Sequence, residues 1–250
     1  MNTAKLRTVT LTTGFATLLM SHMASAQDAT AGGQVGMGLP GATGQTAPAA
    51  PAGGTDHSLF VGHLGVGYLG LATLGVGAPG APGQANVDAP VIGVRYWMNP
   101  DMGLDLGLGL GIDGGSNDPA NDPPSHWAIV LHGGVPLALG GGRHYTFEVI
   151  PEANIGFGGG SATMGGTDIS NKGFALDLGA RAGAEIQFGF IGLPELALQG
   201  SIGAKFSIAS ASSTPDGGTK TSVSSYRFGT NVYANPWAIF TNTVSALYYF

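Results

Sequence analysis

The sequence predicts an all-β protein, a transmembrane antiparallel up-and-down β-barrel, and three observations lead to this fold. Apolar residues recur at every second position over long stretches after residue 57. Charged residues make up only 10% of the 250 residues, against about 25% in an ordinary soluble domain. The few charges within these stretches lie at the alternate positions, opposite the apolar ones. A barrel in lipid has apolar side chains outside and polar side chains in its lumen, as these patterns require.

The first 26 residues have the features of a secretory signal peptide. Lys5 and Arg7 precede a short apolar stretch from Val9 to Met20, and Ala24-Ser25-Ala26 forms a small-residue cleavage pattern. We therefore expect export and cleavage after Ala26.

The next segment differs in composition from the rest of the chain. Residues 27–56 are rich in Gly, Ala and Pro, and such a stretch buries too little apolar surface to offset its ordering entropy. We expect a flexible N-terminal segment over 27–56 and the barrel over 57–250.

The clearest strand runs from Met102 to Ile112. Every even position in it is large and apolar, and the odd positions are Gly or Asp105, which gives the strand one apolar face and one small or polar face. The same alternation predicts further strands near 59–71, 90–98, 126–139, 145–157, 173–190 and 195–209, and a last one that ends at Phe250.

Charged residues share one parity within each predicted strand, which places them in the lumen. The predicted lumen network consists of Arg95, Asp105, Glu148, Glu152, Asp177, Arg181, Glu185 and Lys205. The interior of an eight-strand barrel is just wide enough for side chains to fill, so we expect ion pairs across it. The inward glycines 65, 67, 107, 109 and 111 are expected to make room for Arg95 and Arg181.

Aromatic residues on the apolar parity fall near the strand ends, as two interfacial girdles would require. With the N-terminus in the periplasm, one girdle would contain Tyr96, Tyr145, Phe147, Phe188, Phe190, Tyr248 and Phe250. The other would contain Tyr68, Trp127, Phe157, Phe174 and Phe206.

The connections alternate between short and long, as in barrels with periplasmic turns and extracellular loops. Short turns are predicted at 99–101, 140–143 and 192–195, and long loops at 75–89, 113–125, 158–172 and 210–221. The segment 222–250 is too long for one spanning strand, which needs about 9–11 residues, and Pro236 interrupts it. We favour eight strands with 222–235 in a partly β-structured last loop; a ten-strand barrel is the alternative.

Over residues 57–250 the chain resembles the small bacterial outer-membrane β-barrel proteins. Its last positions of one parity, Val244, Ala246, Tyr248 and Phe250, resemble the C-terminal signal that the barrel assembly machinery recognises in that family. The resemblance implies an outer-membrane location in a Gram-negative cell envelope, with membrane lipid and the assembly machinery as partners.

Other classes of function find little support in the residues. Cysteine is absent, and nine unclustered Lys and Arg residues argue against nucleic-acid binding. The acidic turn at Asp113–Asp118 and Asp122 lacks the spacing of an EF-hand loop, so we assign no metal and no cofactor. No G-x-S-x-G motif is present, which leaves His126, His132 and His144 as the residues around which a hydrolase would have to be built.

These observations favour a non-enzymatic barrel whose lumen is plugged by ion pairs. Its role would be structural or would involve envelope partners bound through the extracellular loops or the Gly/Pro-rich segment. A narrow channel that prefers cations is the alternative, and an outer-membrane enzyme comes third.

Overall fold

The computed structural model describes residues 54–115, 123–230 and 244–250, all within the compact unit Thr46–Phe250. The predicted signal peptide, nearly all of the 27–56 segment and Pro236 lie outside these residues. The elements are η1 (Asp56–Leu59), β1 (Leu64–Val76), β2 (Ala85–Asn99), β3 (Met102–Asp113), β4 (Ser125–Gly134), β5 (Leu137–Gly142), β6 (Tyr145–Met164), β7 (Thr167–Phe188), η2 (Gly189–Ile191), β8 (Leu193–Pro215), β9 (Thr221–Thr230) and β10 (Val244–Tyr249). In the described part of the chain, no helix is long and apolar enough to cross a membrane.

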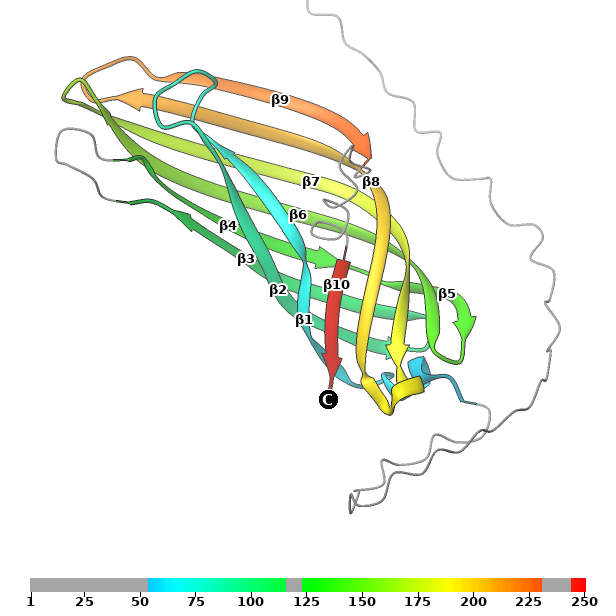
Figure 1. Ribbon diagram of the computed structural model, residues 1–250. Coiled ribbons are helices and arrows are strands. Elements are labelled where there is room, and N and C mark those ends of the chain that lie inside the picture. Colours follow the sequence, from blue (N-terminus) through cyan, green and yellow to red (C-terminus); the bar gives the residue numbers. More distant parts are fainter. Residues whose placement is uncertain (1–53, 116–122, 231–243) are drawn as a thin grey trace, which may run out of the picture. The chain divides into compact units, whose positions relative to one another are not determined.

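The strands form an antiparallel ring in sequence order (Figure 1). β10 closes it by pairing with β1 on one side, with Val66 opposite Tyr248, and with β8 on the other, with Leu196 opposite Tyr248. β5 follows β4 in the same position between β3 and β6. Among the described residues the ring therefore has eight strand positions, and the predicted up-and-down barrel is confirmed.

β9 and β10 follow one another along the same edge of β8. β10 pairs with Leu196–Gly200 and β9 with Ala204–Ser213. Residues 222–230 of the predicted last loop thus form a regular strand, while 231–235 lie outside the described residues.

Two of the long loops predicted from Gly and Ser content are wrong. β6 and β7 continue through 158–172 and meet at Gly165-Gly166, and β8 continues through residue 210 to Pro215. The glycines there serve packing against a hairpin inside the ring: a Cβ at Gly173 would collide with the carbonyl oxygen of Gly75, and one at Gly158 would lie 2.7 Å from Leu74. A long strand with few large side chains is therefore stable at this position.

The strand predicted over 126–139 is divided into β4 and β5 at Val135 and Pro136. Proline has no backbone N–H to donate to the sheet. Instead, the carbonyl of Pro136 accepts a hydrogen bond of 2.8 Å from Gly103, and Val135 donates one of 2.9 Å to Pro151. Despite the interruption, β5 continues the strand position of β4 between β3 and β6.

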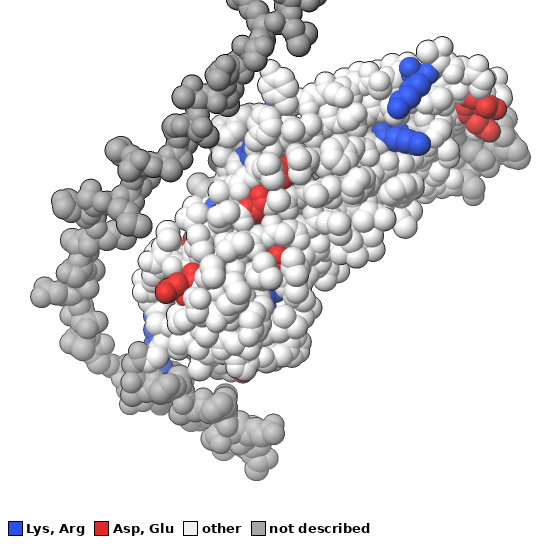
Figure 2. Space-filling model, turned by 180° about the vertical axis from the view of Figure 1, so that it is seen from behind, with Lys and Arg blue, Asp and Glu red and all other residues white. Residues whose placement is uncertain are grey.

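The exterior of the ring is apolar. On β3 the outward side chains Leu106, Leu108 and Leu110 are 45–56% exposed. In Figure 2 most of the visible surface is uncharged, and the charged side chains form small separate groups. Burying such a surface requires lipid, which is the arrangement of a transmembrane barrel.

The aromatic side chains mark the edges of this apolar band. Phe147 and Phe157 lie on the outside of β6, ten residues apart, and are 52% and 47% exposed. At about 3.3 Å per residue and a tilt of about 40°, they are separated by about 25 Å along the barrel axis, the height of the apolar band of such barrels. We call the girdle that contains Phe250 proximal and the one that contains Phe157 distal.

Candidate functional site

Residues 55–63 cover the proximal end of the lumen. Phe60 stacks on Tyr249 with ring centroids 3.9 Å apart, and His57 meets Trp97 edge to face at 4.4 Å. Asp56 is buried, and its carboxylate lies at hydrogen-bond distance, 2.7 Å, from Nδ1 of His144 in the β5–β6 turn. This cap is continuous with an apolar layer that consists of Phe60, Leu69, Val91, Trp97, Ala197, Leu247 and Tyr249.

Next to this layer lies a fully buried charge network centred on Arg95. Its Nε and Nη2 donate to the two carboxylate oxygens of Asp105, both at 2.7 Å. Its Nη1 donates to Glu185 at 2.6 Å and to Glu148 at 3.2 Å. Arg95 on β2 thereby joins carboxylates of β3, β6 and β7, which links walls of the ring that are far apart in the sequence. Gln199 of β8 contacts both Arg95 and Glu148.

A second group of charges extends the network toward the distal end. Arg181 Nε lies 2.8 Å from Glu152, and Arg181 Nη2 lies 3.9 Å from Asp105. Lys205 forms a separate ion pair of 2.6 Å with Asp177. All eight residues predicted for the lumen thus lie on the inner face, six of them in one connected group. Their exposure is uneven, since the Lys205 side chain is 48% exposed and that of Arg95 is fully buried.

A cavity of about 90 Å³ remains beside this second group. It is lined on its polar side by His132, Glu152, Asn154, Asp177, Arg181 and Lys205. The buried His132 Nε2 and Arg181 Nη2 have no hydrogen-bond partner in the described structure, so the cavity is polar enough to hold water.

The distal half of the lumen is filled by a feature that the sequence analysis missed. A β-bulge lies between Tyr68 and Gly70, where Gly70 has φ 135°. Beyond it the β1–β2 hairpin leaves the ring and packs on the inner faces of β4, β6 and β7. Gly77 donates to the carbonyl of Lys172 at 3.2 Å. The resulting apolar layer contains Leu74, Val76, Val87, Ala89, Ala128 and Val130.

The inward glycines do not have the predicted role of making room for Arg95 and Arg181. A Cβ at Gly107 would lie 2.6 Å from Val91, and one at Gly111 would collide with the backbone of Asp88. A Cβ at Gly65 would lie 2.8 Å from the ring of Tyr249. The space that these glycines leave is taken by apolar side chains and backbone, and not by Arg95 or Arg181.

The three histidines considered for hydrolysis lie apart. His126 bonds the carbonyl of Gly83 at 2.6 Å, His132 bonds Asn154 at 2.8 Å and His144 bonds Asp56. Each thus has a different partner at a different height of the barrel. Among the described residues no group of three or more His, Asp or Glu side chains is arranged to hold a metal ion.

The predicted assembly-signal residues lie on the last strand and the terminal residue after it. Val244, Ala246 and Tyr248 alternate with the buried Ser245, Leu247 and Tyr249, and Phe250 is 70% exposed. Phe250 donates its N–H to Leu64 at 3.0 Å, and the rings of Tyr248 and Phe250 lie 5.1 Å apart. The terminal aromatic pair is thus fixed at the proximal girdle.

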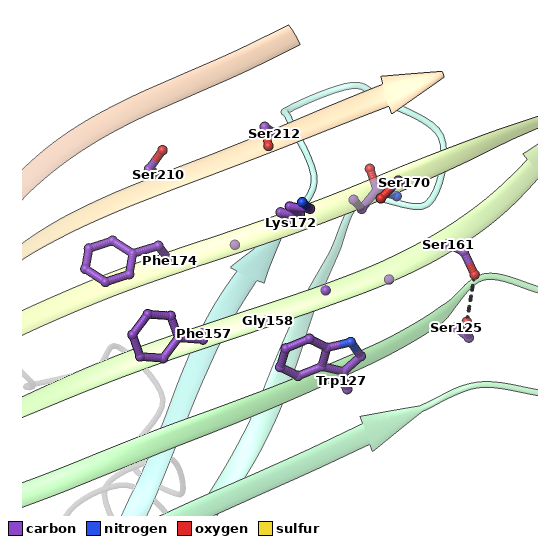
Figure 3. A pocket seen from close by; sticks show the side chains of 14 residues that line it. Ser125, Trp127, Phe157, Gly158, Ser161, Ser170, Lys172, Phe174, Ser210 and Ser212 are labelled. Carbon is purple, nitrogen blue, oxygen red and sulfur yellow. Dashed lines mark hydrogen bonds between the residues drawn. The ribbon is translucent and has the colours of Figure 1, made fainter. Parts of the chain in front are cut away.

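A groove of about 800 Å³ lies on the outside of β4, β6, β7 and β8 at the distal girdle (Figure 3). The rings of Phe157 and Phe174 line one end of it beside Ser210, Trp127 lies level with Lys172 and Ser212, and Ser125, Ser161 and Ser170 line the other end. Among the glycines that line the groove, Gly159 lies on the outer face of β6, whereas Cβ atoms at Gly158, Gly160 and Gly173 would point inward.

Comparison with known proteins finds two solved structures with low similarity to this chain. No protein-family model matches the sequence, and no curated protein matches it. The attachment invasion locus protein Ail of Yersinia pestis has 15% sequence identity and a TM-score of 0.39, over 75% of this chain and 97% of that chain. A major outer membrane protein of Thermus thermophilus has 15% identity and a TM-score of 0.37, over 75% of this chain and 98% of that chain.

The closed ring, the apolar exterior and the aromatic girdles together are the architecture of an outer-membrane β-barrel. These features of the chain itself carry that assignment, and with it contact with membrane lipid.

Proposed function

We propose that this outer-membrane β-barrel is a non-enzymatic, non-conducting envelope protein that binds a partner through its distal strands. The observation that carries the proposal is the filled lumen. Arg95 and three carboxylates lie across it fully or almost fully buried, with an apolar layer and the cap on one side and the inward hairpin on the other. Three successive barriers of this kind leave little room for an ion to pass.

The distal strands support the second half of the proposal. β6 and β7 extend seven residues beyond Phe157 and Phe174, which corresponds to about 23 Å of strand outside the apolar band. On β9, Tyr226 and Phe228 are 80% and 72% exposed. A strand-built projection of this size offers a rigid surface, and binding to a rigid surface loses little conformational entropy.

A narrow cation channel is the second candidate, and the composition of the lumen network favours it. Five carboxylates and three basic side chains line the lumen, and a polar cavity lies among them. An excess of negative charge would favour cations over anions if an ion could pass.

Single-channel recording in a planar bilayer separates the two candidates. The mature protein is refolded, and folding is verified by a heat-dependent shift on a gel. We expect no conductance steps from the folded barrel. Discrete, cation-selective steps would contradict the proposal, and loss of their selectivity in Glu148→Gln would identify the lumen network as the filter.

Partner binding is tested by shortening the distal hairpin. Deletion of residues 162–169, with a two-glycine turn in their place, removes the tip of β6 and β7 and leaves the ring intact. We expect envelope proteins that co-purify with the wild type to be lost from the shortened but folded barrel. Unchanged co-purification would show that the projection is not the binding surface.

A further inference from the structure

The groove at the distal girdle combines apolar and cationic chemistry in the order in which a lipid presents them. Phe157 and Phe174 face outward on neighbouring strands, with ring centroids 5.5 Å apart. Lys172 is the next outward residue after Phe174 on β7, about 7 Å further along the strand and away from the apolar band. The acyl chain of a lipid would contact the phenylalanines, and its headgroup would lie near Lys172.

Gly159 makes room on the outer face of β6 for the ring of Trp127. A Cβ at this position would lie 2.9 Å from Nε1 of Trp127, so the indole ring occupies the space above the glycine. Trp127 is 45% exposed and presents a flat apolar surface beside the phenylalanines. This surface is continuous with the lipid-facing band of the barrel, so a bilayer lipid is the molecule that already lies against it.

The polar side of the groove carries an unmatched positive charge. Lys172 is exposed and forms no ion pair among the described residues. Ser161, Ser170 and Ser212 line the groove near it, with Ser212 directly opposite on β8, and can donate hydroxyl hydrogen bonds. The nearest outward carboxylate on its strand, Asp168, is four residues away and accepts a hydrogen bond of 2.8 Å from Thr163. An ammonium group among hydroxyl groups complements an anionic phosphate.

We propose that this groove binds one anionic phospholipid of the surrounding membrane, with the phosphate against Lys172 and the serines and the acyl chains against Trp127, Phe157 and Phe174. The site lies on the outside of the wall, so the proposal does not depend on whether the lumen conducts.

The test is a lipid titration followed by native mass spectrometry of the refolded mature protein in detergent. The probes are phosphatidylglycerol and phosphatidylcholine with identical acyl chains. A basic residue near a charged lipid surface contributes about 1 kcal/mol, so we expect the first phosphatidylglycerol to bind about fivefold more tightly than phosphatidylcholine. Lys172→Gln should abolish this preference. Lys220→Gln is the matched control, because Lys220 is exposed in the β8–β9 turn and does not line the groove; it should retain the preference.

Equal affinity of the wild type for the two lipids would overturn the proposal, as would equal effects of the two lysine substitutions. The apolar half of the site is tested by Phe174→Ala, which should weaken both lipids without changing their ratio. An unchanged affinity in that variant, or displacement of the lipid by inorganic phosphate alone, would show that no lipid site exists here.

Discussion

Arg95 connects the walls of the barrel, and its replacement is the most direct test of how the lumen is held. Arg95→Met keeps much of the side-chain volume but removes the charge and all the donors. Asp105, Glu148 and Glu185, each 0–1% exposed, would then lose their shared cation. Arg95→Lys would keep the charge and lose the two-pronged contact with Asp105.

The expected cost follows from burial. Removing one partner of a buried ion pair costs about 3–5 kcal/mol, because the remaining charge stays buried without compensation. We expect Arg95→Met to fall in or above this range. Arg95→Lys should cost about 2 kcal/mol, since hydrogen bonds to charged groups contribute about 1.5–3 kcal/mol each and the amine can still reach one carboxylate.

Urea unfolding of the refolded barrel, followed by tryptophan fluorescence, measures these differences. With a slope of about 2 kcal/mol per molar urea, a loss of about 4 kcal/mol lowers the midpoint by about 2 M. Arg227→Met is the matched control, because Arg227 is exposed on β9, and should stay within about 0.5 kcal/mol of the wild type.

A rescue experiment separates lost charge compensation from lost packing. In the Arg95→Met background, Asp105→Asn together with Glu185→Gln removes two of the stranded charges and should recover at least half of the loss. The reasoning is refuted if Arg95→Met unfolds at the wild-type midpoint, or if neutralising the carboxylates restores nothing.

Three further substitutions test other parts of the architecture. Leu108→Arg places a charge on the apolar exterior of β3 and should destabilise the barrel in lipid vesicles by about 2–4 kcal/mol, whereas a water-facing site would show almost no change. Gly173→Val pushes against Gly75 and should cost about 1–3 kcal/mol while exposing the β1–β2 turn to protease; an uncut turn would argue against the inward hairpin. Asp56→Ala removes the carboxylate that bonds His144, and hydrogen exchange should then rise in residues 55–63 while the rest of the barrel stays protected; uniform exchange would contradict a separable cap.

The ring was predictable from the sequence because a strand pattern is local. In Met102–Ile112 the alternation of apolar and small residues tells which side chains point outward and which point inward. The same alternation placed Arg95, Asp105 and Arg181 in the lumen. The partners within the network were not predictable, since they depend on the register between strands distant in the sequence. Arg95 and Glu185, for example, are 90 residues apart.

The inward hairpin was missed because one residue changes the parity. Tyr68 faces outward and the adjacent Leu69 is buried, and after the bulge Leu74 and Val76 also point inward. Two adjacent large apolar residues before a glycine were the available signal. The Gly- and Ser-rich extensions of β6 to β8 looked like loops because their stability comes from the hairpin packed against them, and no local pattern records that contact.

The bulge at Gly70 therefore divides the molecule into two kinds of β-structure. On its proximal side the ring is closed, lipid covers the outside, and side chains alone fill the lumen. On its distal side the hairpin takes the place of a lumen, so the strands beyond the girdle pack on an apolar layer, as a soluble two-layer sheet does. A barrel that only had to cross the membrane would need no such layer. Its presence gives the projecting strands a core of their own, and this favours a function performed by a rigid surface outside the membrane.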